Sequence, residues 1–252
     1  MEQIAVVTGG SSGIGAALAR ALSGRGWRCV LLARREEPLR KLAEEVGGEH
    51  EVCDVGDRDA VERTAAAVLA RHPEIKLLVN NAGIPGRTGF VDADPERIEL
   101  VMRVNYLGSV WCLSAFLPGL LAAVPSDVVN VTSVAGTVTA GTSGPYSASK
   151  HAQVSFSRAV TAELKPRGVR VHTVLPGFVE TEGFPQRAVF PRLMHAMIAE
   201  PEDVARAVLE AIDRDKREVY VPRYYRLAAV AQALFPGSVA RAAASGRMKK
   251  PA

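Results

Sequence analysis

The 252-residue chain has few cysteines and little net charge. Its three cysteines, Cys29, Cys53 and Cys112, form no CxxC pair, so we expect buried thiols in a reducing compartment and no disulfide framework. The five histidines are scattered along the chain, and we therefore expect no metal site. A formal charge of +4 is too small an excess to indicate a nucleic-acid partner.

The chain also lacks the usual signals for secretion or for crossing a membrane. No charged segment with a signal-type apolar run precedes Ile4, so we expect no secretory leader. A bilayer-spanning helix needs about 18 consecutive apolar residues, and no uninterrupted run of that kind occurs. These absences predict a cytoplasmic protein without a transmembrane helix.

Apolar residues, by contrast, are abundant: 48% of the chain is hydrophobic and 23% is charged, as in a globular protein. Short, nearly continuous apolar runs such as Ile4–Val7 and Cys29–Leu32 alternate with helical stretches. Such runs are typical of parallel strands covered on both faces, and the alternation indicates βαβ units. We expect one α/β domain over residues 1–221, a Rossmann-like doubly wound parallel sheet. Further strands are expected at 51–53, 77–79, 127–131, 169–174 and 218–221, and helices at 14–22, 39–46, 59–69, 98–117, 147–164 and from 201.

A glycine-rich turn, Thr8–Gly15, joins the first expected strand to the first helix. Glycine is needed there if the backbone must approach a pyrophosphate without an intervening Cβ. The helix N-terminus then offers unpaired N–H groups and the positive end of its dipole. A turn without a ligand is the alternative, but this position between strand and helix favours a dinucleotide site. Its expected members are Gly9, Ser11, Ser12, Gly13, Ile14 and Gly15.

The second expected strand ends at Ala33 and is followed by Arg34 and Arg35. An NAD enzyme usually has an acidic residue here, which accepts a hydrogen bond from the ribose 2′-hydroxyl. Guanidinium groups instead suit a 2′-phosphate. The alternative is a solvated cluster in which the arginines pair with Glu36 and Glu37. We favour NADP(H) over NAD(H), with Arg34 as the main determinant.

Tyr146 and Lys150 lie four residues apart at the start of an expected helix, so they share one face. A nearby ammonium lowers the pKa of a phenol, which can then exchange a proton with a carbonyl or alcohol oxygen. The alternative is an exposed tyrosine and lysine on an amphipathic helix. Ser133 follows an expected strand at the ligand-binding edge of the sheet. The Ser133 hydroxyl could hold a substrate oxygen, although Ser133 could also be a turn or cap residue. The neighbouring Thr132 is the alternative candidate for the same role.

Together these motifs resemble the short-chain dehydrogenase/reductase family. The resemblance is carried by Thr8-Gly9-x-x-x-Gly13-x-Gly15, Asn80-Asn81-Ala82-Gly83, Ser133, Tyr146-x-x-x-Lys150 and Pro176-Gly177. Their order and intervals match the single-domain branch to about Val221. The interval between the first two motif glycines argues against the longer, epimerase-like branch.

The resemblance implies a role for each matching residue. Tyr146 would be the general acid/base, and Lys150 would bind the nicotinamide ribose and lower the pKa of the tyrosine. Ser133 would orient the substrate oxygen, and Asn105 would support a proton relay through Lys150. Further cofactor contacts would come from Asp54 and Val55 at the adenine, and from Asn81, Ala82, Gly83, Pro176, Gly177, Val179 and Thr181. Ser12 stands where some NADP enzymes carry a basic residue.

The resemblance also makes 182–199 the substrate lid. Its apolar residues, Phe184 and Phe190 among them, favour a hydrophobic substrate, with ordinary packing of a helical insert as an equal alternative. By the same resemblance, helices near 105–117 and 147–164 would pair in a homodimer or homotetramer.

The segment 222–252 extends beyond the motif set. From Val219 onward the chain has six basic and no acidic residues. Apolar residues recur there at helical spacing, at Leu227, Val230, Ala231 and Leu234, before a stop at 235–237. Such a basic amphipathic helix suits peripheral contact with an anionic membrane, the cap of a neighbour's active site, or packing on its own subunit.

The sequence therefore predicts an NADP(H)-dependent oxidoreductase acting on a small-molecule carbonyl or secondary alcohol. A non-catalytic NAD(P)-binding regulatory protein on the same fold is the alternative.

Overall fold

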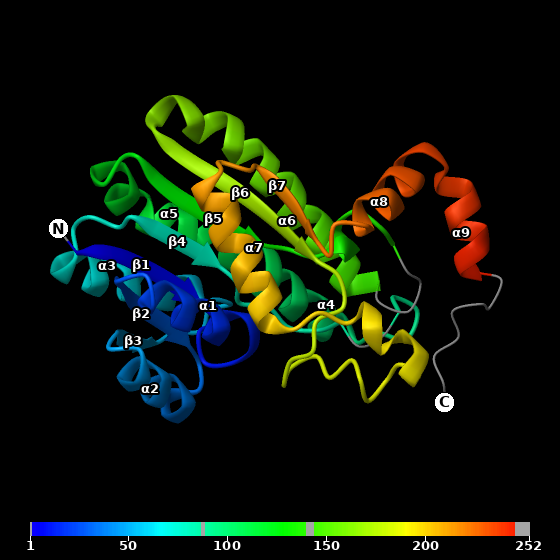
Figure 1. The fold of residues 1–252 in the computed structure, drawn as a ribbon, viewed down its shortest axis with the longest axis horizontal. Helices are drawn as coiled ribbons and strands as arrows, with labels where there is room; N and C mark the ends of the chain where they lie inside the picture. The colour runs from blue at the N-terminus through cyan, green and yellow to red at the C-terminus, as the bar shows by residue number, and fades with distance from the viewer. Residues whose placement is uncertain (1, 87–88, 140–143, 245–252) are drawn as a thin grey trace.

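The computed structural model describes residues 2–86, 89–139 and 144–244, and within them a seven-stranded parallel sheet (Figure 1). The strand order is β3-β2-β1-β4-β5-β6-β7. The predicted doubly wound α/β fold is confirmed. The strands are β1 (Gln3–Thr8), β2 (Trp27–Ala33), β3 (Glu49–Val52), β4 (Leu77–Asn80), β5 (Ser126–Val131), β6 (Val169–Pro176) and β7 (Glu218–Val221).

Helices cover both faces of the sheet and explain the continuous apolar strands. On β1, Val7 belongs to the hydrophobic cluster under one helical layer, and its neighbour Val6 belongs to the cluster under the other. Successive strand residues point to opposite faces, so both valines are fully buried. One layer holds α1 (Gly13–Ser23), α2 (Glu36–Glu45) and α7 (Pro201–Asp213), and the other holds α3 (Arg58–Arg71), α5 (Gly108–Ala122) and α6 (Gly144–Leu164).

The strand order reverses beside β1, and this places the ligand crevice. β2 and β3 lie on one side of β1, and β4 lies on the other, with Val7 paired to Val79. In open α/β sheets, ligands bind outside the carboxyl ends of the strands at such a switch point. The turn after Thr8 and the segment after Asn80 therefore meet at one edge of the sheet.

The single helix expected at 98–117 is longer and is interrupted. It consists of α4 (Pro95–Met102), a π-helical turn, η1 (Arg103–Leu107), and α5. Contrary to the expectation from its sequence, the continuous helix Pro95–Ala122 has the length and apolarity of a membrane span. Half of its apolar window is buried inside the fold, and α5 packs on α3, β4 and β5. Burial in the core accounts for this hydrophobicity.

The C-terminal segment forms two helices rather than one. α8 (Tyr225–Leu234) ends as expected, but α9 (Pro236–Ala244) begins at the proline that was expected to stop the helix. Proline has no N–H to lose at the first helical position and has a suitable fixed φ. α8 packs through Tyr225 and Ala229 on a small apolar cluster beside β7. The basic residues Arg247, Lys249 and Lys250 lie outside the described residues.

All three cysteines are free and buried, as the sequence predicts. Desolvation raises the pKa of the Cys29 thiol to about 12, and it raises the pKa of the Cys53 and Cys112 thiols as well. Thiols that stay protonated are poor nucleophiles and poor metal ligands. These cysteines are therefore packing residues.

Candidate active site

A cavity of about 400 Å³ opens along the carboxyl ends of the strands. Ser133, Tyr146 and Lys150 line one part of it, and Arg34 and Arg35 line another. Every sequence-predicted site residue lines this cavity except Gly15 and Asn105, which lie behind its wall. The other predicted residues in the lining are Gly9, Ser11, Ser12, Gly13, Ile14, Asp54, Val55, Asn81, Ala82, Gly83, Pro176, Gly177, Val179 and Thr181.

The glycine-rich turn has the backbone that an anion site needs. Gly9 and Gly13 have φ of 67° and 55°, which favour glycine. A Cβ on Gly15 would lie 2.2 Å from the carbonyl oxygen of Gly9, so α1 can pack this closely on the turn only without a side chain there. Ser12, the N-cap of α1, makes no side-chain cap bond, and the first turn has no acidic residue. The turn therefore fits a phosphate group.

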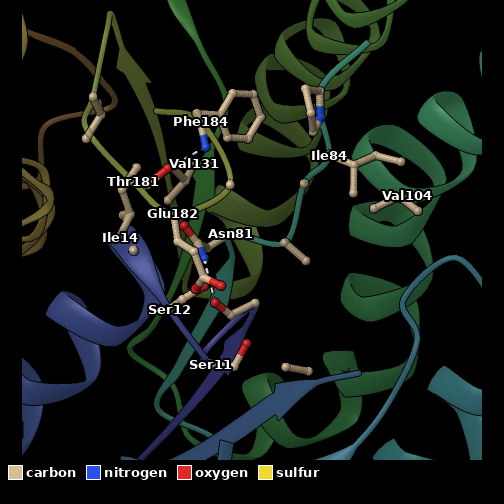
Figure 2. Close-up of a pocket in the computed structure, with 18 of the residues that line it drawn as sticks. Ser11, Ser12, Ile14, Asn81, Ile84, Val104, Val131, Thr181, Glu182 and Phe184 are labelled. Carbon is tan, nitrogen blue, oxygen red and sulfur yellow. Dashed lines mark hydrogen bonds between the residues drawn. The ribbon is translucent and has the colours of Figure 1, made fainter. Parts of the chain in front are cut away.

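Thr8 and Asn81 hold this turn against the segment after β4. The Thr8 hydroxyl donates to the Val79 carbonyl at 3.2 Å and accepts from the backbone N–H groups of Asn81 and Ala82 at 3.0 and 3.1 Å. The Asn81 side chain donates back to the carbonyl oxygens of Thr8 and Gly9 at 3.0 and 3.3 Å. These bonds make the floor of the cavity rigid and place Asn81 beside the glycines (Figure 2).

Arg34 and Arg35 both reach carboxylates, but not those of Glu36 and Glu37. Arg35 forms a bidentate pair with Glu182 at 2.6 and 3.1 Å and also donates to Ser12 Oγ at 3.0 Å. Arg34 lies 3.9 Å from Asp54. The carboxylate partners are therefore Asp54 and Glu182 rather than Glu36 and Glu37, as the helix-start alternative would require, and both arginines line the cavity. The Arg35 guanidinium therefore lies next to Ser12, the position at which some NADP enzymes carry a basic residue.

Ser133, Tyr146 and Lys150 gather at the other end of the cavity. A hydrogen bond from Ser133 lowers the pKa of Tyr146, but burial has the larger effect and raises it. The net direction of the Tyr146 pKa is therefore opposite to the lowering that was expected from Lys150. Thr132 donates its hydroxyl to the Val174 carbonyl at 2.9 Å and so is tied to the sheet. Ser133 has the capping role, because its Oγ accepts from the Ala135 N–H of a short 3₁₀ turn at 3.1 Å, and it also lines the cavity.

Lys150 is almost completely buried, and this burial disfavours the charged form of its side chain. Its ammonium lies 5.8 Å from the centre of the Tyr146 ring. It donates to the Val131 carbonyl at 3.3 Å and to Gln153 Oε1 at 2.8 Å. Desolvation lowers the pKa of Lys150 to about 7, because no carboxylate compensates for the lost water. Gln153, one helical turn further on, was not expected from the sequence.

Asn105 lies behind the lysine in the π-helical turn between α4 and α5. Its side chain donates to the Ile84 carbonyl and to Ser149 Oγ, both at 3.0 Å, and accepts from the Ile84 N–H at 2.8 Å. A Cβ on Gly83 would lie 3.4 Å from Asn105 Oδ1 and 3.7 Å from Lys150 Nζ. Asn105 thus ties the segment after β4 to α6. The π-helical turn is common at functional positions, and it was not expected from the sequence.

The lid contributes residues that the sequence motifs did not include. Thr181 and Phe184 form a two-residue bridge closing a tight turn, and the Phe184 ring lies 5.8 Å from the Tyr146 ring. Figure 2 shows this turn above the glycine-rich segment. The segment from Arg192 to Met197 is a 3₁₀ helix. Unpredicted residues in the lining are Leu32, Ala33, Cys53, Ile84, Pro85, Val104, Val131, Thr132, Glu182, Gly183, Phe184 and Gln186.

Comparison with known proteins agrees with this geometry. The family model described as short chain dehydrogenase matches residues 3–188. Short-chain dehydrogenase/reductase 3 from Bos taurus is 34% identical over 225 residues, which cover 86% of this chain and 74% of that protein. The 3-oxoacyl-[acyl-carrier-protein] reductase of Bos taurus is 35% identical over 184 residues, covering 72% of this chain and 78% of the relative.

Solved structures show the same architecture. A variant of actinorhodin polyketide ketoreductase with NADPH has a TM-score of 0.79 and 31% identity, covering 87% of this chain and 95% of the other. A short-chain dehydrogenase/reductase from Burkholderia phymatum in complex with NAD has a TM-score of 0.82 and 25% identity, covering 92% and 93%. Both forms of the cofactor therefore occur among the structures that this chain resembles.

Proposed function

The chain belongs to the short-chain dehydrogenase family, and on this premise we propose that it is an NADP(H)-dependent enzyme that interconverts a carbonyl group and a secondary alcohol on a hydrophobic small molecule. As a member of the family it is an oxidoreductase that uses a nicotinamide cofactor. The observation that carries the finer proposal is one cavity lined by Tyr146, Ser133 and Lys150 and also by Arg34 and Arg35.

A bound nicotinamide supplies or accepts the hydride at the substrate carbon. The chain's own residues manage the proton on the substrate oxygen. Because burial raises the pKa of Tyr146, its phenol is protonated at neutral pH and can donate to an oxygen that becomes an alcohol. Ser133 offers a second hydroxyl for that oxygen. In the reverse direction the Tyr146 oxygen would accept the proton of the alcohol.

Lys150 and Asn105 support the phenol from behind. Lys150 Nζ is held between the Val131 carbonyl and Gln153, so its position is defined without cofactor contacts. Asn105 fixes Ile84 and Ser149, on the two segments that flank the lysine. A regulatory protein that only bound a nucleotide would have no need of Ser133, Tyr146, Lys150 and Asn105 together. The joint placement of these four residues supports the enzyme over that alternative.

The cationic end of the cavity supports NADP(H). The residue directly after Ala33 is Arg34. An NAD enzyme usually has an acidic residue at this position, which holds the ribose 2′-hydroxyl. Arg34 and Arg35 line the cavity instead, and guanidinium groups suit multidentate binding of a phosphate. The hydrophobic substrate is supported by the lid: Phe184 covers Tyr146, and Val189, Leu193 and Met197 present exposed apolar side chains nearby in the chain.

Turnover with a substrate panel tests this proposal. Wild-type enzyme and NADPH are assayed against hydrophobic aldehydes, ketones and quinones, with polar sugars as the comparison series. We expect NADPH oxidation with members of the hydrophobic series and less with the sugars. Tight NADPH binding without turnover across the whole panel would instead support the regulatory alternative.

Two proposals concern the surface. Core packing leaves Trp111, Leu117 and Leu121 of α5 only partly buried, and these side chains support a homodimer or homotetramer through α5 and α6. Light scattering of Leu117→Asp should then show a smaller assembly.

Exposed Leu227, Val230 and Leu234 on α8, with the basic sequence after Val219, support peripheral contact with an anionic membrane. Liposome flotation of a variant with serine at these three positions tests this contact, and unchanged partitioning would end it.

The location proposed for the enzyme is the cytoplasm. It rests on the three unpaired thiols at Cys29, Cys53 and Cys112, which suit a reducing compartment.

A further inference from the structure

Glu182 connects the lid to the cofactor-recognition end of the cavity. It lies in the tight turn that Thr181 and Phe184 close, and its carboxylate receives both terminal nitrogens of Arg35, at 2.6 and 3.1 Å. Figure 2 shows the Glu182 side chain extending from this turn toward Ser12. Arg35 also donates to Ser12 Oγ at 3.0 Å. One guanidinium group therefore holds together two segments that are far apart in the chain.

Glu182 occupies the edge of Arg35 formed by its two terminal nitrogens, which is one of the edges that could bind a phosphate. A guanidinium binds carboxylate and phosphate through the same fork of parallel N–H donors. Arg35 lowers the pKa of Glu182 through this pair, so the carboxylate remains ionised at neutral pH. Two anions cannot share one fork without mutual repulsion. A phosphate group that binds the two terminal nitrogens of Arg35 would therefore compete with Glu182.

We propose that Glu182 is a specificity-determining residue whose carboxylate competes with the 2′-phosphate of NADP(H) for Arg35, so that the phosphorylated cofactor releases the lid turn and NAD(H) leaves it attached. This inference rests on the proposed function, because it takes Arg35 to bind the 2′-phosphate. The inference adds that Glu182, a residue of the chain itself, competes with the 2′-phosphate for Arg35. The two arginines alone would give a stronger preference for NADP(H) than the intact chain has.

The competition is modest because the pair is exposed. The Arg35 and Glu182 side chains are 49% and 65% exposed, and exposed pairs contribute roughly 0.2–1 kcal/mol. Removal of the competing charge should then change the ratio of the two cofactor affinities by about two- to fivefold. Glu182→Gln keeps the size of the side chain and removes its charge, which makes it the suitable variant.

Direct binding measures this ratio without depending on turnover. Dissociation constants for NADPH and NADH are measured for the wild type and for Glu182→Gln. We expect the preference for NADPH to rise about two- to fivefold. Glu45→Gln is the matched control, because Arg20 and Glu45 form a similarly exposed bidentate pair at 2.6 and 2.9 Å outside the cavity lining. It should leave the ratio unchanged.

The same substitution in an Arg35→Gln background isolates the competition. There Glu182→Gln should no longer raise the preference for NADPH. An unchanged or lowered preference in the single variant would overturn the inference, since it would mean that Glu182 does not compete or that it holds Arg35 in a productive position. If the wild type binds neither cofactor, the proposed function fails instead. If it prefers NADH irrespective of Arg34 and Arg35, the NADP(H) assignment fails.

Hydrogen exchange gives a second, structural readout. The N–H groups of Gln186 and Arg187 both donate to Glu180, at 3.0 and 2.8 Å, and the Phe184 N–H donates to Thr181 Oγ1 at 3.1 Å. Release of Glu182 should loosen this turn. We expect faster exchange over 182–187 with adenosine 2′,5′-bisphosphate than with adenosine 5′-diphosphate, which has no 2′-phosphate. Equal exchange with the two ligands, both bound at saturation, would contradict the release of the lid.

Discussion

At the Tyr146 end of the cavity the candidate side chains are mostly buried, with Tyr146 itself partly buried, whereas at the Arg34 end they are largely exposed. Lys150 is 3% exposed and Asn105 is fully buried, while the Arg34 side chain is 57% exposed. At the first end desolvation shifts the pKa of Tyr146 upward and that of Lys150 downward. At the second end charges pair in water, where each pair contributes little. On the proposed function, we therefore expect chemistry and cofactor selection to respond to substitution on very different scales.

The largest effect is expected at the partly buried phenol of Tyr146. Tyr146→Phe removes the proton donor and leaves the ring that packs against Phe184. We expect kcat to fall by a factor on the order of 10² or more, the usual contribution of general acid–base catalysis. Tyr106→Phe is a suitable control, because Tyr106 packs on Phe156 and is not part of the cavity lining. Near-normal turnover of Tyr146→Phe, with NADPH binding retained, would remove the contrast between the two ends.

Lys150→Met tests the cost of the buried ammonium. Burial lowers the pKa of Lys150 to about 7 in the folded chain, below its ordinary value in the unfolded chain. Between these values the unfolded state binds more protons, so wild-type stability rises with pH. We expect Lys150→Met to lose most turnover and to unfold at higher denaturant concentration than the wild type. The stability gain should be larger at pH 6 than at pH 9. If the stability gain of Lys150→Met did not shrink toward pH 9, the charge of Lys150 would not be what destabilises the folded wild type.

At the exposed end, Arg34→Asp replaces the cation with the acidic residue typical of NAD enzymes. The 2′-phosphate loses a donor and meets a like charge, while the 2′-hydroxyl of NADH gains an acceptor. We expect the ratio of kcat/KM for NADPH to that for NADH to fall roughly tenfold or more, a change of about 1.4 kcal/mol. An unchanged ratio would mean that Arg34 does not recognise the cofactor.

The same contrast explains how much could be predicted from the sequence. The strands and the catalytic motif were predictable because local residue order determines them: apolar runs mark strands, and Tyr146 and Lys150 share a helical face. Contacts between distant segments were not. Arg35 and Glu182 are 147 positions apart, and nothing near either residue indicates the other. The direction of the Tyr146 pKa was also missed, because burial depends on packing that the motif does not contain.

A smaller effect is expected one turn below Lys150. Gln153→Leu removes the oxygen that accepts from the ammonium at 2.8 Å, which disfavours the charged form and lowers the pKa of Lys150 further. If the charged form is required, kcat/KM of the wild type falls as the pH rises through about 7. In Gln153→Leu this decline should move to lower pH by about one to two units, since a hydrogen bond to a charged group contributes roughly 1.5–3 kcal/mol. A pH profile that stays in place would show that Gln153 only fills space.

The smallest effect is expected at a carboxylate that lies close to the arginines in sequence but does not reach them. Glu37 pairs with Arg40 and Lys41 on its own helix, both at 3.1 Å, and is not part of the cavity lining. Glu37→Gln should therefore change the NADPH-to-NADH affinity ratio by less than about twofold, within the range of an exposed pair. Direct titration with both cofactors measures this ratio. A shift as large as that of Arg34→Asp would mean that net charge near the second strand, rather than contact with the cofactor, controls selection at this end of the cavity.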